Sequence, residues 1–397
     1  MADSKHSPVN IALVAPDGLS VVLFCKGIIR SLKNIPGARV IVICDAGKYE
    51  QEISSLGVAC VALPMYRWFS PWEDIKYTYR LWRVMRSYGC DTIFNFCTKQ
   101  NIYGTFAGKL SGAKTNYLHV VGLGSGFEKR EDFRGKIMRL GYVCLYRIAC
   151  RWSDKAWFTN GNDRQFFIDN RLISGESTVL TRNYMDTSDY ALDLVGEERK
   201  KQAMALCGLE HGEKVVVMVA RMIWQKGIRE FSEAAELLRD SYPMLKFILI
   251  APLEEGSADA VPESYVQAKE QSANFQWLGF QSDVKSFYAI ADLAVLPTYY
   301  KEGGYPRGLL EPMAMGRPVI GTTSEDCRGA VEDGKNGFLI PIQDSNALAE
   351  AIAQIMADEE LRETMGRYSL EKARRDFDEV AIVSDALRKL GLPVVGV

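Results

Sequence analysis

Short apolar segments of strand length alternate with amphipathic, helix-like segments along most of this chain, and the alternation restricts the folds available to it. The strand-like segments before residue 160 are Asn10–Val14, Val40–Cys44, Val58–Leu63, Thr92–Phe96, Tyr117–Val121 and Lys155–Phe158. Strands separated by helices are typical of parallel sheets that helices cover. A chain of 397 residues, 47% of them hydrophobic, is long enough for two domains with separate cores. We therefore predict a two-domain α/β protein.

One later segment, EGGYPRGLLEPMAMGRPVIGT from Glu302 to Thr322, combines two carboxylates, a Gly-Tyr-Pro turn and an arginine. It follows an apolar run, Leu293–Pro297, that has the length and composition of a buried strand, and it ends in a second strand-like run, Val319–Gly321. In strand-loop-helix-strand units of this kind, ligands bind at the loop that follows the strand. The segment therefore predicts a ligand site, which we interpret as a site for a nucleotide-linked sugar.

The helix of this segment contains Pro312, whose ring would clash with the carbonyl of Gly308 in a helix already formed there. We therefore expect the first full turn at Leu309 or Leu310, which places Glu311 at the helix start. The N–H groups of a glycine-rich loop before a helix can bind hydroxyls and phosphates, and carboxylates accept from sugar hydroxyls. The alternative is an ordinary turn followed by a helix whose first turn carries an acid because of the helix dipole.

A second segment, VVVMVARMIWQKGIREF from Val215 to Phe231, begins as a buried strand, continues through a short loop and ends as an amphipathic helix. The loop contains Arg221 and Lys226, five residues apart, just before Gly227. An arginine offers a planar fork of donors and a lysine offers a point charge, so the pair suits a diphosphate. A solvated basic pair on a surface loop is the alternative, but the two glutamates in the same half of the chain favour a binding site.

The order of these motifs resembles that of the retaining nucleotide-sugar glycosyltransferases of glycosyltransferase family 4, in the type that builds bacterial surface polysaccharides. The shared pattern spans about residues 213 to 341 and includes the basic pair, two glutamates around a Gly-aromatic-Pro turn, a GxPVI strand and DGKNGFLIP, Asp333 to Pro341. One departure is Gly303-Gly304, which makes the stretch between Glu302 and Glu311 one residue longer than in the family. Glycine can absorb an extra residue without a side-chain clash.

The resemblance implies the GT-B fold, in which two Rossmann-like domains face each other across a cleft. The expected parts are an N-terminal acceptor-binding domain, a nucleotide-sugar-binding domain, and a C-terminal helix that packs back on the first domain. Their expected bounds are 1–185, 186–375 and 376–397.

The resemblance also assigns roles to individual residues. Arg221 and Lys226 would hold the diphosphate and stabilise charge on the leaving nucleotide, and Glu302, the third catalytic residue, would contact the donor sugar. The expected donor-binding residues are Gly18, Phe280, Gly303, Gly304, Tyr305, Pro306, Leu310 and Glu311. Among them, Phe280 would lie near the base and Glu311 at the ribose hydroxyls. Retention follows from the family, and we expect a same-face displacement assisted by the leaving phosphate.

The stretch LHVVGLGSGF, Leu118 to Phe127, allows two interpretations. Its glycines after a strand would fit a dinucleotide site, and hence a nicotinamide-dependent oxidoreductase. The next helix, however, begins only after residues 128–132, and a GLG segment followed by a basic helix also occurs in the family that the chain resembles. In that case His119 would contact the donor sugar or the acceptor. As a histidine next to a strand, it could equally be a satisfied core residue.

Two stretches, residues 66–88 and 129–152, mix basic with apolar side chains, and the first of them is rich in Trp and Tyr. Helices of this composition can lie on an anionic membrane surface. They can equally be ordinary amphipathic helices that cover a sheet. If they bind a membrane, the acceptor is a lipid-linked glycan, and polyprenyl diphosphate sugars are the natural candidates.

Composition excludes several other classes of protein. The net charge of −2 argues against general nucleic-acid binding, which usually needs a strongly basic face. The first ten residues contain no apolar signal run, and no segment reaches the ~18 uncharged apolar residues of a membrane span. We therefore expect a cytoplasmic protein, free or peripheral on the cytoplasmic face of the inner membrane. A two-lobed periplasmic sugar-binding protein is the alternative without catalysis, but it would require export.

The sequence gives no sign of a metal-dependent site. The only DxD motif is Asp376-Phe377-Asp378, at the expected start of the last helix, where the helix dipole explains two acids. Three histidines are too few for a histidine-rich metal centre, and nine cysteines without CxxC pairs are expected as reduced thiols in core positions. We therefore expect no cofactor, with Arg221, Lys226 and backbone amides supplying the positive charge that a metal would supply.

Together these observations predict a retaining GT-B glycosyltransferase. It would transfer a hexose or N-acetylhexosamine from a nucleoside diphosphate, for which we expect UDP, to a glycan or a polyprenyl-diphosphate-linked acceptor.

Overall fold

The computed structural model describes residues 9–394 apart from 67–69, 124–132, 255–256, 258, 272–273 and 302–303. The chain divides into two compact units, which are described separately here. Unit 1 combines Met1–Asn183 with Glu379–Val397, and unit 2 is Tyr184–Asp378. The divisions lie close to residues 185 and 375, where the sequence places them.

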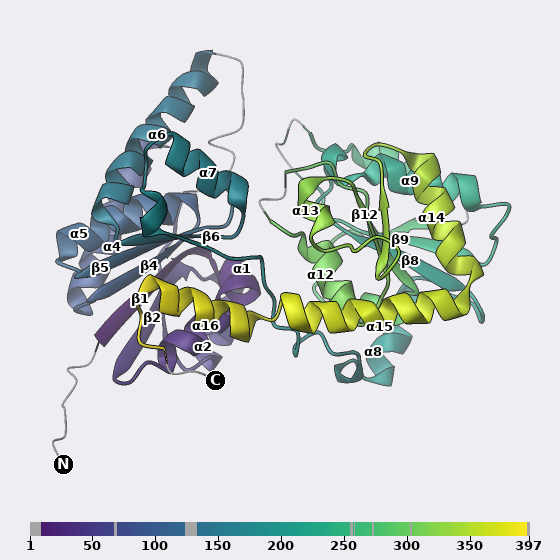
Figure 1. Ribbon diagram of the computed structural model, residues 1–397, viewed down its shortest axis with the longest axis horizontal. Coiled ribbons are helices and arrows are strands. Elements are labelled where there is room, and N and C mark those ends of the chain that lie inside the picture. The colour runs from purple at the N-terminus through teal and green to yellow at the C-terminus, as the bar shows by residue number, and fades with distance from the viewer. Residues whose placement is uncertain are drawn as a thin grey trace. The chain divides into compact units, whose positions relative to one another are not determined.

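Unit 1 is, over its described residues, a parallel sheet of seven strands with helices between them (Figure 1). The strands are β1 (Val9–Asp17), β2 (Ala38–Asp45), β3 (Ala59–Ala62), β4 (Thr92–Phe96), β5 (Thr115–Val120), β6 (Lys155–Phe158) and β7 (Thr178–Leu180). They lie side by side in the order β3-β2-β1-β4-β5-β6-β7. The helices are α1 (Gly18–Ser20), α2 (Lys26–Lys33), α3 (Glu50–Ser55), α4 (Pro71–Ser87), α5 (Thr105–Ser111), α6 (Phe133–Trp152), α7 (Gly161–Asp169) and α16 (Glu379–Leu390).

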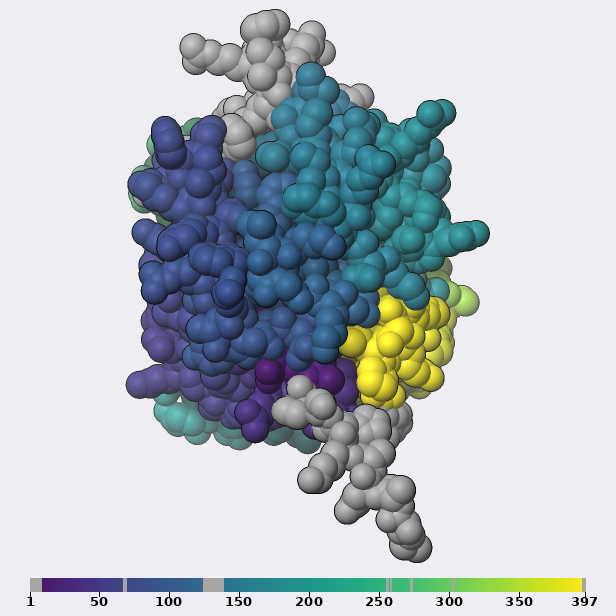
Figure 2. Space-filling model, turned by 90° about the vertical axis from the view of Figure 1, so that its left-hand side faces the viewer, coloured from purple at the N-terminus to yellow at the C-terminus, as the bar shows by residue number. Residues whose placement is uncertain are grey.

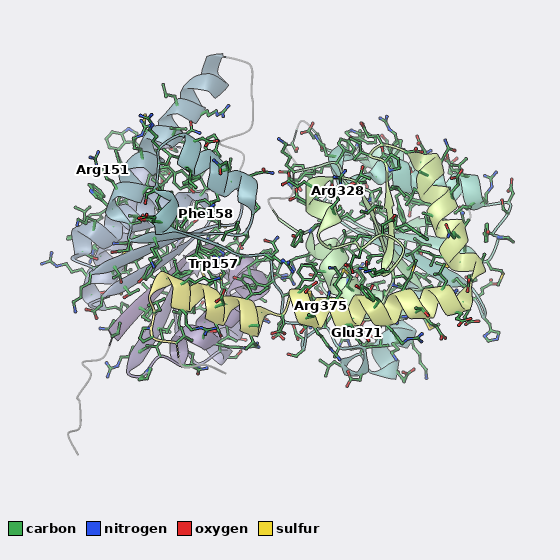
Figure 3. The ribbon with its side chains drawn as sticks, viewed as in Figure 1. Arg151, Trp157, Phe158, Arg328, Glu371 and Arg375 are labelled. Carbon is green, nitrogen blue, oxygen red and sulfur yellow. The ribbon has the colours of Figure 1, made fainter. Side chains whose placement is uncertain are left out.

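Both faces of the central part of this sheet are buried. Neighbouring residues of a strand point to opposite faces, and Trp157 and Phe158, which are neighbours on β6, are both fully buried (Figure 3). All five residues of β4 are buried as well. Strands that are covered on both faces are continuous apolar runs, which is why the central strands can be recognised in the sequence. β3 is recognised by its apolar composition although it is partly exposed. β7 has only three residues and escapes recognition for that reason.

The C-terminal helix α16 packs within unit 1, against α2, β6 and β7. Val383, Ala386 and Leu387 form part of its buried face. At Gly27 of α2, a Cβ atom would come within 2.5 Å of the Glu379 side chain, so the absence of a side chain there lets the two helices approach closely. The expected return of the C-terminal helix to the N-terminal domain is therefore confirmed.

Unit 2 contains, among its described residues, a second parallel sheet, of six strands. The strands are β8 (Lys214–Val219), β9 (Leu245–Ile250), β10 (Phe275–Trp277), β11 (Leu293–Leu296), β12 (Val319–Thr322) and β13 (Gly337–Ile340). Their order is β10-β9-β8-β11-β12-β13. The helices are α8 (Glu197–Leu206), α9 (Ile228–Leu238), α10 (Glu263–Lys269), α11 (Val284–Ile290), α12 (Arg307–Ala314), α13 (Glu325–Arg328), α14 (Ser345–Ala357) and α15 (Glu359–Asp376).

Counted along the chain, the strand order of unit 2 is 3-2-1-4-5-6, which is that of a Rossmann fold. The six strands of unit 1 from the edge strand β3 across to β6 follow the same order. Both units are therefore Rossmann-like, and the predicted α/β class with two Rossmann-like domains is confirmed.

The explanation offered for the DxD motif does not hold for Asp376, although Asp378 does directly precede α16. Asp376 is the last residue of α15, and α16 begins only at Glu379, so Asp376 does not lie at a helix start. Its carboxylate instead accepts from the Arg375 guanidinium at 2.9 Å and from the Lys372 ammonium at 3.0 Å, and these two bonds lower the pKa of Asp376 to about 2. Asp378 accepts from the Thr187 hydroxyl at 2.7 Å. Both acids are thus explained by local partners.

The nine cysteines all have free thiols. Six are buried, as expected for core positions, and Cys60 and Cys97 are partly buried. Burial raises the pKa of Cys97 to about 12 and that of Cys90 to about 11. Cys144 on α6 departs from the expectation because its side chain is exposed.

Truncation of Leu387 tests the packing of α16. Leu387 is fully buried, so Leu387→Ala should lower the free energy of unfolding by about 2–5 kcal/mol, from lost apolar burial and the cavity left behind. Urea denaturation followed by circular dichroism measures the change. Lys389→Ala, at an exposed position of the same helix, is the control and should change stability little. Equal stability of the two variants would contradict the assigned packing.

Candidate functional site

Two segments with predicted ligand-binding residues meet at one edge of the unit 2 sheet. β8 and β11 are neighbours, and the connections leave them in opposite directions across the sheet. In an open parallel sheet, ligands bind outside the carboxyl ends of the strands at such a reversal. Arg221 and Lys226 follow β8, while residues 297–306 follow β11. The strand order therefore brings the basic loop and the Gly-Tyr-Pro turn to the same place.

The side chain of Tyr300 joins the two basic residues. The Arg221 guanidinium lies 5.0 Å and the Lys226 ammonium 5.2 Å from the centre of the Tyr300 ring. At these distances a cation is attracted to the face of an aromatic ring. Lys226 is only 8% exposed, whereas the Arg221 side chain is 46% exposed. The two cations are therefore gathered at one point, one held firmly and one open to solvent.

The loops after β8 and β11 are hydrogen-bonded to each other. The carbonyl of Gln225 accepts from the N–H of Tyr299 at 2.8 Å, from the N–H of Tyr300 at 3.1 Å and from the hydroxyl of Thr298 at 3.1 Å. The next turn requires a glycine, because Gly227 has a φ of +85° and a Cβ atom there would lie 2.4 Å from the carbonyl oxygen of Pro297. Lys226 is thus fixed on both sides by backbone contacts.

Helix α12 begins earlier than the sequence predicts. It starts at Arg307, with Pro306 as its N-cap, and Pro312 lies inside it. The N–H groups of Leu309 and Leu310 both donate to the Pro306 carbonyl, at 2.9 and 3.2 Å. Proline removes one helical hydrogen bond, but the helix buries a run of side chains from Leu309 to Ala314 in the core of unit 2, which offsets that cost. Glu311 consequently lies in the second turn rather than at the helix start.

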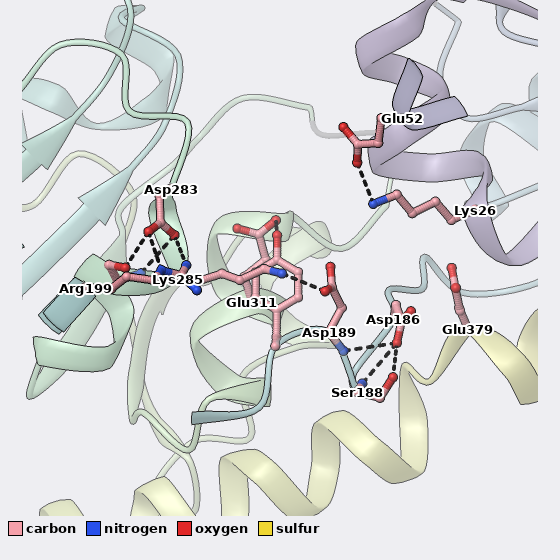
Figure 4. Close-up of polar contacts among 12 residues, drawn as sticks. Lys26, Glu52, Asp186, Ser188, Asp189, Arg199, Asp283, Lys285, Glu311 and Glu379 are labelled. Carbon is pink, nitrogen blue, oxygen red and sulfur yellow. Dashed lines mark hydrogen bonds and ion pairs between the residues drawn. The ribbon is translucent and has the colours of Figure 1, made fainter. Parts of the chain in front are cut away.

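Glu311 belongs to a buried polar cluster. One of its carboxylate oxygens, Oε1, accepts from Arg307 Nε at 2.7 Å and from the Tyr190 hydroxyl at 3.0 Å, and Arg307 Nη2 lies 3.2 Å from the same hydroxyl. Glu311 is 7% exposed. Nearby in unit 2, Lys285 forms an ion pair with Asp189 at 2.7 Å (Figure 4). Glu311 is therefore oriented by neighbours that the motif itself does not reveal.

The pKa shifts in this cluster follow from burial and charge. Burial, together with the negative Glu311, raises the pKa of the Tyr190 phenol well above its ordinary value. Burial alone would lower the pKa of Arg307, but the Glu311 carboxylate and the Tyr190 hydroxyl outweigh it, and the pKa of the guanidinium is raised. Arg307 therefore stays charged and Tyr190 stays neutral at physiological pH.

The described residues of the predicted turn, Gly304 to Pro306, make contacts within unit 2. The N–H of Gly304 donates to the Asp326 carboxylate at 3.1 Å. The Tyr305 ring packs edge-on against Phe377, with ring centres 5.4 Å apart, and lies over Gly329, where no side chain would fit. Pro306 caps α12, and Leu310 is fully buried in the core. Any contact of Leu310 with a ligand would have to involve its backbone. Glu302 and Gly303 lie outside the described residues.

Two further predicted donor-binding residues belong to other segments of the chain. Phe280 follows β10, the edge strand of unit 2, and is 56% exposed. Gly18 opens α1 directly after β1 of unit 1, where a Cβ atom would lie 2.4 Å from the Ala46 carbonyl oxygen, so close packing already requires glycine. Their roles toward a donor remain predictions.

His119 is a core residue of unit 1, which corrects the expectation that it contacts a sugar. Its ring is fully buried and stacks on Trp157, with centres 4.0 Å and planes 6° apart. Phe94 and Phe96 pack edge-on against it. Burial lowers the pKa of His119 to about 3, so the imidazole is neutral at physiological pH. Of the two interpretations that the sequence allows, the structure favours the core histidine.

The described residues of the glycine-rich stretch after β5 are Gly122 and Leu123. Residues 124–132, which include most of the GLGSG stretch and the basic residues before α6, lie outside the described residues. Within the described ranges, no three His, Cys, Asp or Glu side chains form a group that could hold a metal ion.

The sequence reveals some members of this site and conceals others. Arg307 stands four residues before Glu311, the spacing of a helical ion pair, and could have been recognised from that. For Tyr300 the sequence offers only a weak indication, namely that two tyrosines are adjacent in a loop. Tyr190 gave none, because 121 residues separate it from Glu311.

Comparison with known proteins places these features in context. Residues 199–372 match the family model described as Glycosyl transferases group 1. A protein of Campylobacter jejuni, named N,N'-diacetylbacillosaminyl-diphospho-undecaprenol alpha-1,3-N-acetylgalactosaminyltransferase, is 26% identical over 96% of this chain and 98% of its own length. An Escherichia coli protein, named UDP-Gal:alpha-D-GlcNAc-diphosphoundecaprenol alpha-1,3-galactosyltransferase, is 22% identical over 81% of this chain and 80% of its own length.

Solved structures show the same architecture. The crystal structure of Anabaena HepE in complex with UDP and glucose superimposes with a TM-score of 0.75 at 19% identity, over 96% of this chain and 99% of that chain. The shared fold, the group 1 domain over most of unit 2 and the named relatives together support a glycosyltransferase of the GT-B type.

Removal of Arg307 tests the buried cluster. Arg307→Met should destabilise the protein by about 3–5 kcal/mol, because Glu311 would lose its buried counter-charge. Urea denaturation measures the loss, and Arg307→Met combined with Glu311→Leu should recover most of it. Lys200→Met, which breaks an exposed ion pair with Glu197, is the control and should shift the midpoint little. If Arg307→Met is as stable as the wild type, the cluster does not have the assigned role.

Proposed function

We propose that this chain is a retaining glycosyltransferase of family 4, which transfers a hexose or N-acetylhexosamine from a nucleoside diphosphate to a glycan or a polyprenyl-diphosphate-linked acceptor. UDP is the proposed carrier, and assembly of a surface polysaccharide or related glycan is the proposed context. The observation that supports it best is the meeting of Arg221 and Lys226 on the Tyr300 ring at the carboxyl ends of β8 and β11. A diphosphate is a group whose charge such a pair would neutralise.

In the proposed reaction, the bond between the anomeric carbon and the phosphate oxygen breaks, and the bonding electrons leave with the diphosphate. Negative charge therefore grows at the phosphate in the transition state, where fixed cations stabilise it most. Lys226 is held by the backbone around Gly227, so its ammonium needs little reorganisation, whereas the more exposed Arg221 can adjust to the departing phosphate. Glu302 is proposed to accept from sugar hydroxyls and Glu311 from the ribose.

Retention of configuration is proposed to follow from attack on the face that the diphosphate leaves. The acceptor hydroxyl forms the new bond to the anomeric carbon and gives its proton to the leaving phosphate oxygen, so charge and protons balance without a covalent enzyme intermediate. The proposed reaction needs no resident metal, because Arg221, Lys226 and backbone N–H groups supply the positive charge.

The names of the relatives support a lipid-linked acceptor. Both name a diphospho-undecaprenol substrate, and we extend that class of acceptor to this chain. None of the helices in the described part of the chain has the length and apolar character needed to cross a membrane. We therefore propose that the protein acts at the cytoplasmic face of the inner membrane as a peripheral protein. The contact would involve α4 and the region of residues 129–152, where basic and apolar side chains mix.

A thermal-shift screen tests the donor class. UDP should raise the melting temperature of the purified protein more than GDP, ADP, NAD or free sugars do, and Mg²⁺ should add little, because a ligand that binds the native state stabilises it. Stabilisation by NAD alone would indicate the oxidoreductase, and stabilisation by a free sugar alone would indicate a sugar-binding protein without catalysis.

Substitution of the buried cation tests the chemistry. Lys226→Ala should lower the turnover number for sugar transfer about 100-fold or more, because one charge that stabilises the leaving diphosphate is lost. Glu302→Gln should have an effect of similar size. Radiolabelled transfer from a UDP-sugar measures both. The control is Lys269→Ala, since Lys269 lies over another tyrosine ring, that of Tyr265 at 5.6 Å, but on α10. Turnover near that of the wild type in both test variants would reject the site.

A further inference from the structure

The first few and the last few residues of unit 2 are bonded to each other in one junction. The N–H of Met185 donates to the Phe377 carbonyl at 3.0 Å, and the Thr187 hydroxyl donates to the Asp378 carboxylate at 2.7 Å. Met185 and Phe377 are fully buried. After Asp378 the chain continues as α16, drawn in yellow on the surface of unit 1 (Figure 2). The two points where the chain passes between the units therefore share one set of hydrogen bonds.

A short turn connects this junction to the side chain of Tyr190. The Asp186 carboxylate accepts from the N–H groups of Ser188 and Asp189, each at 3.1 Å (Figure 4). Asp189 forms an ion pair with Lys285 at 2.7 Å, and the Lys285 ammonium lies 5.0 Å from the centre of the Tyr190 ring. Tyr190 itself is only 5% exposed. The path from the junction to Tyr190 is therefore short and is fixed by contacts at each step.

The Tyr190 hydroxyl contacts the carboxylate that is proposed to bind the ribose. It donates to Glu311 Oε1 at 3.0 Å and accepts from Arg307 Nη2 at 3.2 Å. Arg307 Nε donates to the same carboxylate oxygen at 2.7 Å. Neither of these two bonds to Glu311 uses its second oxygen, Oε2. The hydroxyl and the guanidinium together therefore fix the direction in which Oε2 points.

A second contact links the junction to the same helix. The Phe377 ring packs edge-on against the Tyr305 ring, with centres 5.4 Å apart. Tyr305 stands directly before Pro306, the N-cap of α12, and Glu311 lies in the second turn of that helix. The junction thus contacts the segment that starts α12 directly, and the second turn of α12 through Tyr190.

We propose that Tyr190 is a positioning residue, which directs Glu311 Oε2 toward the ribose hydroxyls and couples occupation of the ribose site to the order of the junction. The role of Glu311 toward the ribose rests on the proposed function. A ribose hydroxyl bonded to Oε2 restrains the carboxylate, so the bond from Tyr190 to Oε1 becomes harder to break. Local opening of residues 184–190 requires that bond to break, and bound nucleotide therefore opposes the opening. By linkage, an ordered junction favours the nucleotide in return.

Calorimetric titration of the full-length protein with two nucleotides tests the positioning role. UDP and 2′,3′-dideoxyuridine diphosphate differ only in the ribose hydroxyls. The wild type should bind UDP about tenfold or more tightly, because the dideoxy probe cannot donate to the carboxylate. Tyr190→Phe removes one hydroxyl and keeps the ring. It should lower this preference about fivefold, by weakening UDP while the dissociation constant of the dideoxy probe stays unchanged.

Two further variants separate positioning from a general structural effect. Tyr265→Phe, the matched control, removes another tyrosine hydroxyl of unit 2, which lies 3.0 Å from the Ser232 hydroxyl, and should leave both dissociation constants unchanged. Glu311→Gln should also lower the preference, and Tyr190→Phe added to it should lower it no further, because Tyr190 acts through Glu311. A wild-type preference in Tyr190→Phe, or full additivity of the two substitutions, would overturn the positioning role.

Hydrogen exchange followed by mass spectrometry tests the coupling. At saturating nucleotide, UDP should slow amide exchange in residues 184–190 of the wild type about fivefold, and the dideoxy probe should slow it less. In Tyr190→Phe, saturating UDP should not slow exchange there, whereas Tyr265→Phe should keep the wild-type behaviour. If UDP leaves this exchange unchanged in the wild type, or slows it equally in Tyr190→Phe, the coupling does not exist.

Transfer assays distinguish failure of this proposal from failure of the proposed function. If sugar is transferred from a UDP-sugar but Tyr190→Phe matches Tyr265→Phe in every measurement, the reaction stands and the role of Tyr190 is wrong. If the ribose preference and the slowed exchange both depend on Tyr190 but no sugar is transferred, the coupling stands and the proposed reaction is wrong. If UDP does not bind the wild type at all, the titration alone rejects both.

Discussion

The carbonyl oxygen of Gln225 is the point on which the candidate site depends. It accepts hydrogen bonds from three groups of the segment after β11, and so ties the loop that contains Lys226 to the loop that leads into α12. A parallel sheet brings the carboxyl ends of β8 and β11 to one edge, but it does not by itself hold the irregular backbone beyond them. This bonding, together with the close approach of Gly227 to Pro297, supplies that rigidity.

The cationic side chains near this edge of the unit 2 sheet have two different roles. Arg307 is partly buried and donates hydrogen bonds to Glu311 and Tyr190, so it orients other protein groups. Arg221 and Lys226 lie against the Tyr300 ring instead, and Arg221 also forms a long ion pair with Glu254 at 3.9 Å. Arginine and lysine residues that look alike in the sequence therefore differ in function because of the partners that the fold gives them.

The sequence is sufficient to predict the fold class and to locate most strands, because strands covered on both faces form continuous apolar runs. It also identifies Arg221, Lys226 and Glu311 as a set, although it does not show that Tyr300 joins the two cations or that Tyr190 contacts Glu311. Those contacts depend on strand order and on packing between distant segments. The sequence predicts too late a start for α12, because the burial of its side chains offsets the cost of having Pro312 inside the helix. The case of His119 is similar, since its burial against Trp157 cannot be inferred from neighbouring residues.

The single exposed cysteine has a practical consequence for chemical labelling. Thiol reagents attack the thiolate, and both inaccessibility and a raised pKa suppress that reaction at the buried cysteines. Cys144 is exposed on α6. A maleimide dye would therefore attach preferentially at this position of α6 in the unaltered protein. Cys144 can therefore hold a spectroscopic reporter on α6 without any change to the sequence.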